Sequence, residues 1–306
     1  MVLQSGESHS TGARADVSVI AHIVQARALL NAGPAVLATV TQVQGSVPRE
    51  VGAWMVIGVD QVINTIGGGH LEFDVIAQAR QWLAQTASSP TTSLQAHEPL
   101  HESPTAGLTL RFALGPSLGQ CCGGVVHLTL QRVQASDLVL LEQRWLAALQ
   151  PFALFGGGHV GRALIHILGT LPFSVRWIDS RDEIFPEPCP INVTTEHSDP
   201  VHAAVLDLPA GAHVFIMSFS HAEDLDVVAA CLKRQSERAD LGMIGLIGSK
   251  TKWATFRRRL QERGFSQEAL SQVVCPIGLP GITGKAPEVI AVAVAAQLLT
   301  LPATKH

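Results

Sequence analysis

A glycine-rich turn in the middle of the chain has the residue types and spacing that bind a phosphate group. The apolar run Phe152–Phe155 leads directly into three glycines in the order GxGxxG, at Gly156, Gly158 and Gly161, and a helical pattern follows. In that context the first glycine permits a tight turn, the second lets the backbone approach a phosphate, and the third lets helix and strand pack closely. The helix start adds free N–H groups. We therefore predict a phosphate site here, with His159 among its candidate contacts.

An acidic residue at the end of the next predicted strand supports a nucleotide-like ligand. Asp179 lies 18 residues after Gly161, near the roughly 20-residue offset of an acid that binds a ribose hydroxyl. Arg181 follows closely and is placed to meet an additional phosphate. Two interpretations stay open: the glycine turn binds a ligand, or its glycines serve only the packing of a structural βαβ unit. A Rossmann site does not by itself establish hydride transfer.

A second polar cluster, Ser218–Asp226, follows another predicted strand. Ligands of open parallel sheets bind over the carboxyl ends of the strands, so this cluster is expected to face the same crevice as the glycine turn. His221 could act as an acid, a base or a hydrogen-bond donor. The alternative is helix capping by Ser220, with acids such as Asp224 in the first turn. Both roles remain open.

Two further segments have residues that suit an anionic ligand. Lys250 and Lys252 stand where a strand is expected to enter a helix, although a solvated basic helix face would have the same composition. Gly284 and Lys285 end a glycine-rich loop that departs from the P-loop template at two positions. A glycine loop before a helix can still bind an anion through its N–H groups.

The adjacent cysteines Cys121 and Cys122 are the most unusual feature of the first half. They lie between glycines, and their spacing is not that of a zinc site. A thiol in such a loop could contact a partner or a soft ligand, either sulfur or a metal. The alternative is a pair of small buried apolar residues.

The second half of the chain, residues 151–306, must position the glycine turn. Its strands and helices alternate, which predicts a Rossmann-like parallel sheet covered by helices. The expected strands are Phe152–Phe155, Val175–Ile178, Asn192–Thr195, His213–Ser218 and Gly242–Ile247. The expected helices are Val160–Leu168, Asp224–Arg234, Lys250–Arg263 and Pro287–Leu299.

The first half reads as a loose tail over residues 1–16 and an α+β domain over residues 17–150, with Pro151 at the boundary. Asp16 and Asp137 are the predicted N-caps of its first and last helices. The expected helices are Val17–Leu30, one that ends near Leu83, and Asp137–Gln150. The expected strands are Ala35–Val43, Trp54–Val59, Val62–Ile66, Leu108–Leu114 and Val125–Val133.

Composition narrows the class of protein. The chain is 47% hydrophobic and 15% charged with a net charge of −4, so it can bury sizeable cores and has no basic block for nucleic acid. The most apolar stretch, Val289–Leu301, is too short to span a bilayer. Five cysteines without an evident export signal favour free thiols in the cytoplasm.

Taken together, these motifs resemble one family, the xanthine dehydrogenase accessory proteins of the XdhC/CoxI type. The tail and residues 86–105 have no part in the resemblance. The matching segments are Gly45–Val56, Thr65–Glu72, Leu118–Gly124, Phe155–Gly161, Trp177–Arg181, Ser220–Asp226, Gly245–Lys250 and Cys275–Pro280.

The resemblance implies an XdhC/CoxI domain followed by a Rossmann-like domain. It also implies a chaperone that binds and protects the molybdenum cofactor, molybdopterin, and supports its sulfuration by a cysteine desulfurase. The chaperone then inserts the cofactor into apo-xanthine dehydrogenase and catalyses no reaction of its own. Cys121 and Cys122 become candidates for contact with the molybdenum end or with transferred sulfur, and the glycine turn for contact with the phosphate. A homodimer is left open.

The alternative is an NAD(P)-dependent oxidoreductase, because the glycine turn and Asp179 suit a dinucleotide equally well. No proton donor or substrate anchor stands out in the sequence with comparable specificity.

Overall fold

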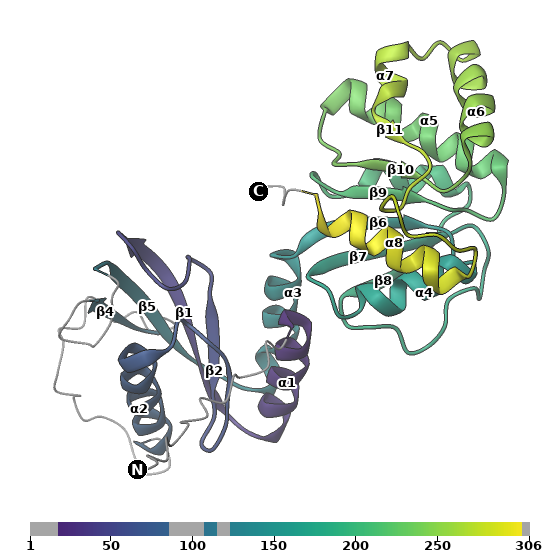
Figure 1. Cartoon of the computed structure of the whole chain (residues 1–306). Coiled ribbons are helices and arrows are strands. Elements are labelled where there is room, and N and C mark those ends of the chain that lie inside the picture. Colours follow the sequence, from purple (N-terminus) through teal and green to yellow (C-terminus); the bar gives the residue numbers. More distant parts are fainter. Residues whose placement is uncertain (1–17, 86–106, 115–122, 302–306) are drawn as a thin grey trace, which may run out of the picture.

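The protein is built on two separate sheets (Figure 1). The computed structural model describes residues 18–85, 107–114 and 123–301. The first sheet is antiparallel, with the strand order β3-β2-β1-β5-β4. The second is parallel, with the order β11-β10-β9-β6-β7-β8.

The first sheet has a helix layer on each face, because its strands alternate apolar side chains between two cores. In β1, Val36 and Ala38 pack with α2, whereas Leu37 packs with α1 and α3. The elements are α1 (Val19–Ala32), β1 (Ala35–Gln44), β2 (Trp54–Ile57), β3 (Val62–Asn64), α2 (Gly69–Gln85), β4 (Leu108–Ala113), β5 (Val125–Val133), a 3₁₀ turn (Ala135–Asp137) and α3 (Leu138–Ala147).

Two stacked tryptophans hold α3 against the first sheet. Trp54 of β2 and Trp145 of α3 have ring centroids 4.2 Å apart, with an angle of 15° between the ring planes. Both side chains are buried, together with Leu138 and Leu141 of the same helix. Helix α3 leads directly into the first strand of the second sheet, so this stack lies close to the connection between the two sheets.

The second sheet has the strand order of a Rossmann fold, with its first strand, β6, in the middle. Helices α4 and α8 cover one face, and α5, α6 and α7 cover the other (Figure 1). The elements are β6 (Gln150–Phe155), α4 (His159–Leu168), β7 (Phe173–Asp179), β8 (Val193–His197), a 3₁₀ segment (Val201–Asp207), β9 (His213–Ile216), α5 (His221–Arg238), β10 (Ile244–Leu246), α6 (Lys250–Glu262), α7 (Gln267–Ser271), β11 (Val273–Val274) and α8 (Pro287–Leu299). The predicted fold class is confirmed.

Several predicted details of the elements were wrong. The short elements β11 and α7 were not predicted, because two to five residues show too little periodicity. The N-cap of α1 is Ser18, whose hydroxyl accepts a hydrogen bond from the N–H of Ala21, and not Asp16. Asp137 is at the N-cap of α3, but its carboxylate accepts from the N–H of Gln134 at the preceding 3₁₀ turn.

The apolar stretch near the C-terminus is helix α8, whose inner face packs against α4 and the sheet. Its polar interruption, Gln297, accepts a hydrogen bond from the N–H of Gly278 at 2.7 Å. Within the part of the chain that the structure describes, no helix is both long and apolar enough to span a membrane.

Replacing Trp145 by alanine is expected to lower the free energy of unfolding by about 3 kcal/mol, because it removes a large buried ring and leaves Trp54 without its stacking partner. Urea denaturation followed by circular dichroism measures this. Val139→Ala is the control, since Val139 lies on the same helix and is 65% exposed, and it is expected to change stability by less than about 0.5 kcal/mol. Equal effects of the two substitutions would contradict the assigned role of the stack.

Candidate functional site

The carboxyl edge of the second sheet collects most of the predicted site residues. The glycine turn follows β6, Asp179 ends β7, Ser218–Asp224 follows β9, and the Lys250 segment follows β10. All four strands are parallel, so their carboxyl ends lie at the same edge. The strand order reverses between β6 and β9, which is where open α/β sheets bind ligands.

Two glycines of the turn are required by the protein's own packing. Gly156 has φ +124°, and a Cβ atom placed there would lie 2.0 Å from the carbonyl oxygen of Met217, just beyond β9. A Cβ atom at Gly161 would lie 2.1 Å from the carbonyl oxygen of Gly156. Glycine is therefore needed at the first position for backbone conformation and close approach, and at the third for contact between helix and strand.

Gly158 differs from both, because neither conformation nor packing within the described residues requires glycine there. Its φ is −70°, and a Cβ atom would meet nothing within 4 Å. It is the N-cap of α4, but it has no side chain to cap the helix. The first N–H groups of α4 therefore have no side-chain cap from Gly158, and they lie beside the exposed His159.

The carboxylate of Asp179 is bound by the protein itself. Its side chain is 1% exposed, and it accepts hydrogen bonds from the N–H of Gly157 at 2.5 Å and the N–H of Arg181 at 2.9 Å. The Arg181 guanidinium donates to both carboxylate oxygens, at 2.9 Å each. We expected Asp179 to bind a ribose hydroxyl and Arg181 to meet a phosphate, but each is the other's partner.

These contacts determine the ionisation of Asp179. Burial alone would raise the pKa of this carboxyl, but the hydrogen bonds from Arg181 and from the two backbone N–H groups outweigh it. The pKa is therefore held below its ordinary value. The carboxylate is charged at neutral pH and fixes the glycine turn to the end of β7.

The segment after β7 folds back over the glycine turn, and no helix forms there. A Cβ atom at Gly157 would lie 2.8 Å from a side-chain carbon of Ile184. The Arg162 guanidinium donates to the carbonyl oxygen of Ile184 at 2.8 Å, and the ring of Phe185 meets Trp177 edge to face at 5.0 Å. One side of the glycine turn is therefore covered by the chain's own residues.

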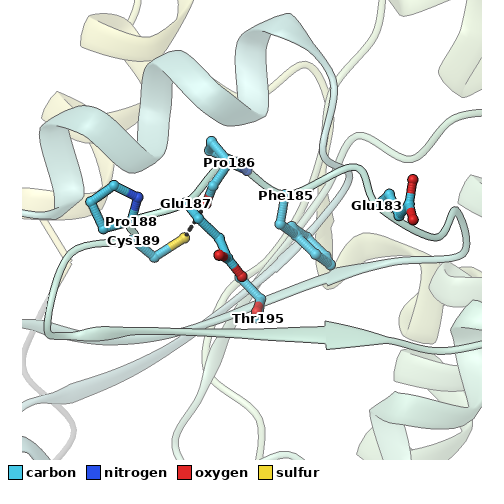
Figure 2. A pocket seen from close by; sticks show the side chains of 7 residues that line it. All are labelled: Glu183, Phe185, Pro186, Glu187, Pro188, Cys189 and Thr195. Carbon is cyan, nitrogen blue, oxygen red and sulfur yellow. Dashed lines mark hydrogen bonds between the residues drawn. The ribbon is translucent and has the colours of Figure 1, made fainter.

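The same segment forms a cavity of about 640 Å³ against β8 (Figure 2). Its lining residues are Glu183, Phe185, Pro186, Glu187, Pro188, Cys189 and Thr195. None of the predicted site residues lines it. The Cys189 thiol donates to the carbonyl oxygen of Pro186 at 3.1 Å, and burial and the nearby Glu187 raise its pKa. This thiol is consequently a poor nucleophile at neutral pH.

On the other side of the crevice, Asp224 is a structural acid. Its side chain is 3% exposed; one oxygen accepts from the N–H of Ser218 at 2.7 Å and the other from the Lys252 ammonium at 2.6 Å. Lys252 also donates to the carbonyl oxygen of Ile247. The sequence pointed to Lys250 and Lys252 together, with Lys250 as the candidate ligand contact, and Lys250 is the exposed first residue of α6. Lys252, two positions later, is the lysine that contacts the strand ends.

His221 is the exposed first residue of α5. The predicted capping is present, since the Ser220 hydroxyl accepts from the N–H of Glu223 at 3.2 Å. Gly284 and Lys285 are also exposed, and Gly284 has φ +153° with Val289 of α8 beside it. Whether His221 or Lys285 contacts a ligand stays a prediction.

The first domain brings its glycine-rich segments to one end of its sheet. A Cβ atom at Gly45 would lie 3.3 Å from the Cα of Gly124, and one at Gly67 would lie 2.4 Å from Pro48. The buried carboxylate of Glu72 accepts hydrogen bonds from Thr65, Ile66, Gly67 and Gly68. Cys121 and Cys122 lie outside the described residues, next to Gly123, so their roles stay predictions. No group of three or more metal-binding side chains occurs in the described residues.

Two family models match the chain. The model described as the XdhC and CoxI family matches residues 28–94, and the XdhC Rossmann domain matches residues 152–298. Together they cover more than two thirds of the chain. The chain belongs to the XdhC/CoxI family.

This XdhC/CoxI protein is similar to a sequence relative and to a solved structure, and the latter has the same fold. The Escherichia coli K12 protein named "uncharacterized protein YqeB" is 25% identical over 270 residues, which are 87% of this chain and 43% of that protein. The chain thus spans less than half the length of this relative. A crystal structure described as a xanthine dehydrogenase from Bacillus halodurans has a TM-score of 0.55 and 18% identity, over 92% of this chain and 95% of that one.

Replacing Lys252 by methionine is expected to lower the free energy of unfolding by about 3 kcal/mol, because it leaves the charge of Asp224 buried without its cation. Thermal and urea denaturation measure the loss. Arg258→Met on the same helix is the control: Arg258 and Glu262 are 73% and 68% exposed, and their ion pair contributes at most about 0.5 kcal/mol. A loss as small as that of the control would show that Lys252 is not needed there.

Asp179→Asn is expected to destabilise the protein in a pH-dependent way. The folded pKa of Asp179 lies below its unfolded value of 3.8, so the stabilisation by the carboxylate is present above that value and disappears as the pH falls through the folded pKa. The difference in unfolding free energy between the two proteins should therefore be constant near neutral pH and shrink as the pH falls below 3.8. Urea titrations across this range measure it, and a constant difference would contradict the assignment.

Proposed function

We propose that this XdhC/CoxI protein is a chaperone for the molybdenum cofactor. It binds molybdopterin, protects it, supports its sulfuration by a cysteine desulfurase, and passes it to an apo-xanthine dehydrogenase. Family membership supports the general maturation role. The cofactor and the partners are the parts of the proposal that need testing.

One observation carries the choice of ligand: the open backbone at Gly158. Glycine stands there although no φ value and no neighbour within the described residues requires it. The adjacent start of α4 presents free N–H groups and the positive end of the helix dipole. A phosphate group is the kind of ligand that would need both the missing side chain and these donors.

The residues of this edge suit a phosphorylated metal cofactor in other respects. Molybdopterin has a terminal phosphate, which the N–H groups beside Gly158 would hold. When bound, the cofactor supplies the redox-active molybdenum; the chain's part is to bind the phosphate and orient the rest. The buried hydroxyl of Ser218, which has no hydrogen-bond partner in the described residues, is a further donor at the same crevice. Cys121 and Cys122 remain the proposed contacts for the metal end or for sulfur.

The alternative, an NAD(P)-dependent oxidoreductase, has less support from the same edge. Its expected ribose acceptor, Asp179, already accepts hydrogen bonds at both oxygens. The two proposals differ in a measurable way, because an oxidoreductase would reduce a substrate with NAD(P)H, whereas a chaperone would retain molybdopterin.

Gly158→Ala is expected to reduce bound molybdopterin at least about tenfold, since the added methyl group would stand where the phosphate approaches; tenfold corresponds to about 1.4 kcal/mol. The protein is purified without oxygen from cells that make the cofactor, and molybdopterin is quantified per chain. The melting temperature should fall only slightly: the methyl group meets no atom of the described chain, and the remaining loss is that alanine is a poorer helix N-cap than glycine.

Gly33→Ala is the matched control, since a Cβ atom at Gly33 also meets nothing within 4 Å. It should retain molybdopterin at the wild-type level. If the wild-type protein has none, or if Gly158→Ala retains all of it, the proposed site is wrong. Binding of NAD(P)H with reduction of a substrate would favour the oxidoreductase.

A further inference from the structure

A cation–aromatic contact crosses the crevice above the glycine turn. Arg181 follows β7 and Phe219 follows β9, and the sheet order places β6 with its glycine turn between these two strands. The guanidinium carbon of Arg181 lies 4.6 Å from the ring centroid of Phe219. A second link runs beside it, where the Ser180 hydroxyl donates to the Glu223 carboxylate at 2.6 Å. We call the Arg181–Phe219 contact the bridge.

The aromatic half of the bridge is unusually exposed: the side chain of Phe219, just after β9, is apolar but 67% exposed. Its neighbours Ser218 and Ser220 are tied down by hydrogen bonds to α5, so the backbone that presents the ring is fixed. Phe219 is not part of either hydrophobic core of the second domain. Core packing therefore does not explain an aromatic residue at this position.

The bridge and Asp179 together occupy the part of the site that a dinucleotide needs. In a Rossmann fold the dinucleotide lies across the crevice, with its adenosine ribose on the acid that ends the second strand. Here that strand is β7 and the acid is Asp179, whose oxygens are taken by Gly157 and Arg181. Arg181 extends from there to Phe219 and spans the space between the ends of β7 and β9.

The bridge does not cover the start of α4. Gly158 and the exposed His159 lie on the open side of the turn, and no contact of the bridge involves them. A phosphate can therefore reach the helix start without displacing Arg181. A ligand with an adenosine group beyond its phosphate would have to break the bridge and free Asp179.

We propose that Arg181 and Phe219 are specificity residues that make this Rossmann site accept a ligand with a single terminal phosphate and reject dinucleotides. The inference rests on the proposed function for the phosphate end and adds the class of ligand that is excluded. It assigns Asp179 to the closed side of the site, where Arg181 and not a ribose is its partner.

Binding of ADP-ribose, measured by isothermal titration calorimetry on the full chain, tests the proposal. Wild-type protein should bind it weakly, and Arg181→Ala should bind it at least about tenfold more tightly, because Asp179 is then free to accept from the ribose hydroxyls. Phe219→Ala opens the bridge from its exposed side and should also increase the affinity, by a smaller factor. It is the safer variant, since the exposed ring contributes little to folding.

Arg263→Ala is the matched control, since Arg263 also pairs with an aspartate, Asp226, at 2.7 Å but on the exposed surface. It should leave ADP-ribose binding at the wild-type level. If the wild-type protein binds ADP-ribose as tightly as Arg181→Ala and Phe219→Ala do, the bridge does not determine specificity. That failure would leave molybdopterin retention and its loss in Gly158→Ala unaffected, so the two proposals can fail separately.

Discussion

The hydrogen bonds accepted by the Asp179 carboxylate hold together the carboxyl edge of the second sheet, where the candidate site lies. It binds the N–H of Gly157 and so joins the glycine turn to the end of β7. It also binds the Arg181 guanidinium, which in turn reaches Phe219 beyond β9. Since the side chain is buried, each of these contacts is stronger than it would be in water. Through these contacts one carboxylate connects the segments that follow β6, β7 and β9.

A buried carboxylate accepts hydrogen bonds from backbone N–H groups at two other turns as well. Asp224 binds the N–H of Ser218 after β9 and the Lys252 ammonium after β10. In the first domain, Glu72 accepts from the N–H groups of the glycine turn that precedes α2. In each case a nearly buried acid takes up backbone donors that loops would otherwise leave unpaired. The start of α4 at Gly158 lacks such an acid among the described residues, which is why we assign the phosphate to it.

Much of this organisation could be predicted from local sequence. The run Phe152–Phe155 with its three glycines predicted strand, turn and helix correctly, because φ and close approach restrict Gly156 and Gly161 to glycine. The alternating strands and helices predicted a parallel sheet, and their order brought the predicted segments to one edge. The pairing of Asp179 with Arg181 was missed, although the two residues are neighbours in sequence. A motif reports which residue types are present, and the partner of each side chain depends on its rotamer and surroundings.

The sequence by itself determined the family, the fold class and the glycine turn. Motifs, backbone conformation and hydrophobic periodicity are local properties, which short stretches of sequence reveal. The tertiary structure alone decided which charges are available. It brought Lys252, and not Lys250, to Asp224, and it placed Phe219 opposite Arg181 across the turn. These contacts join residues 28 and 38 positions apart in the chain. The order of the elements predicts which strand ends share an edge, but no local pattern records which of their side chains contact each other. In the same way, only the structure shows that Asp179, the predicted ribose acceptor, accepts hydrogen bonds from Gly157 and Arg181.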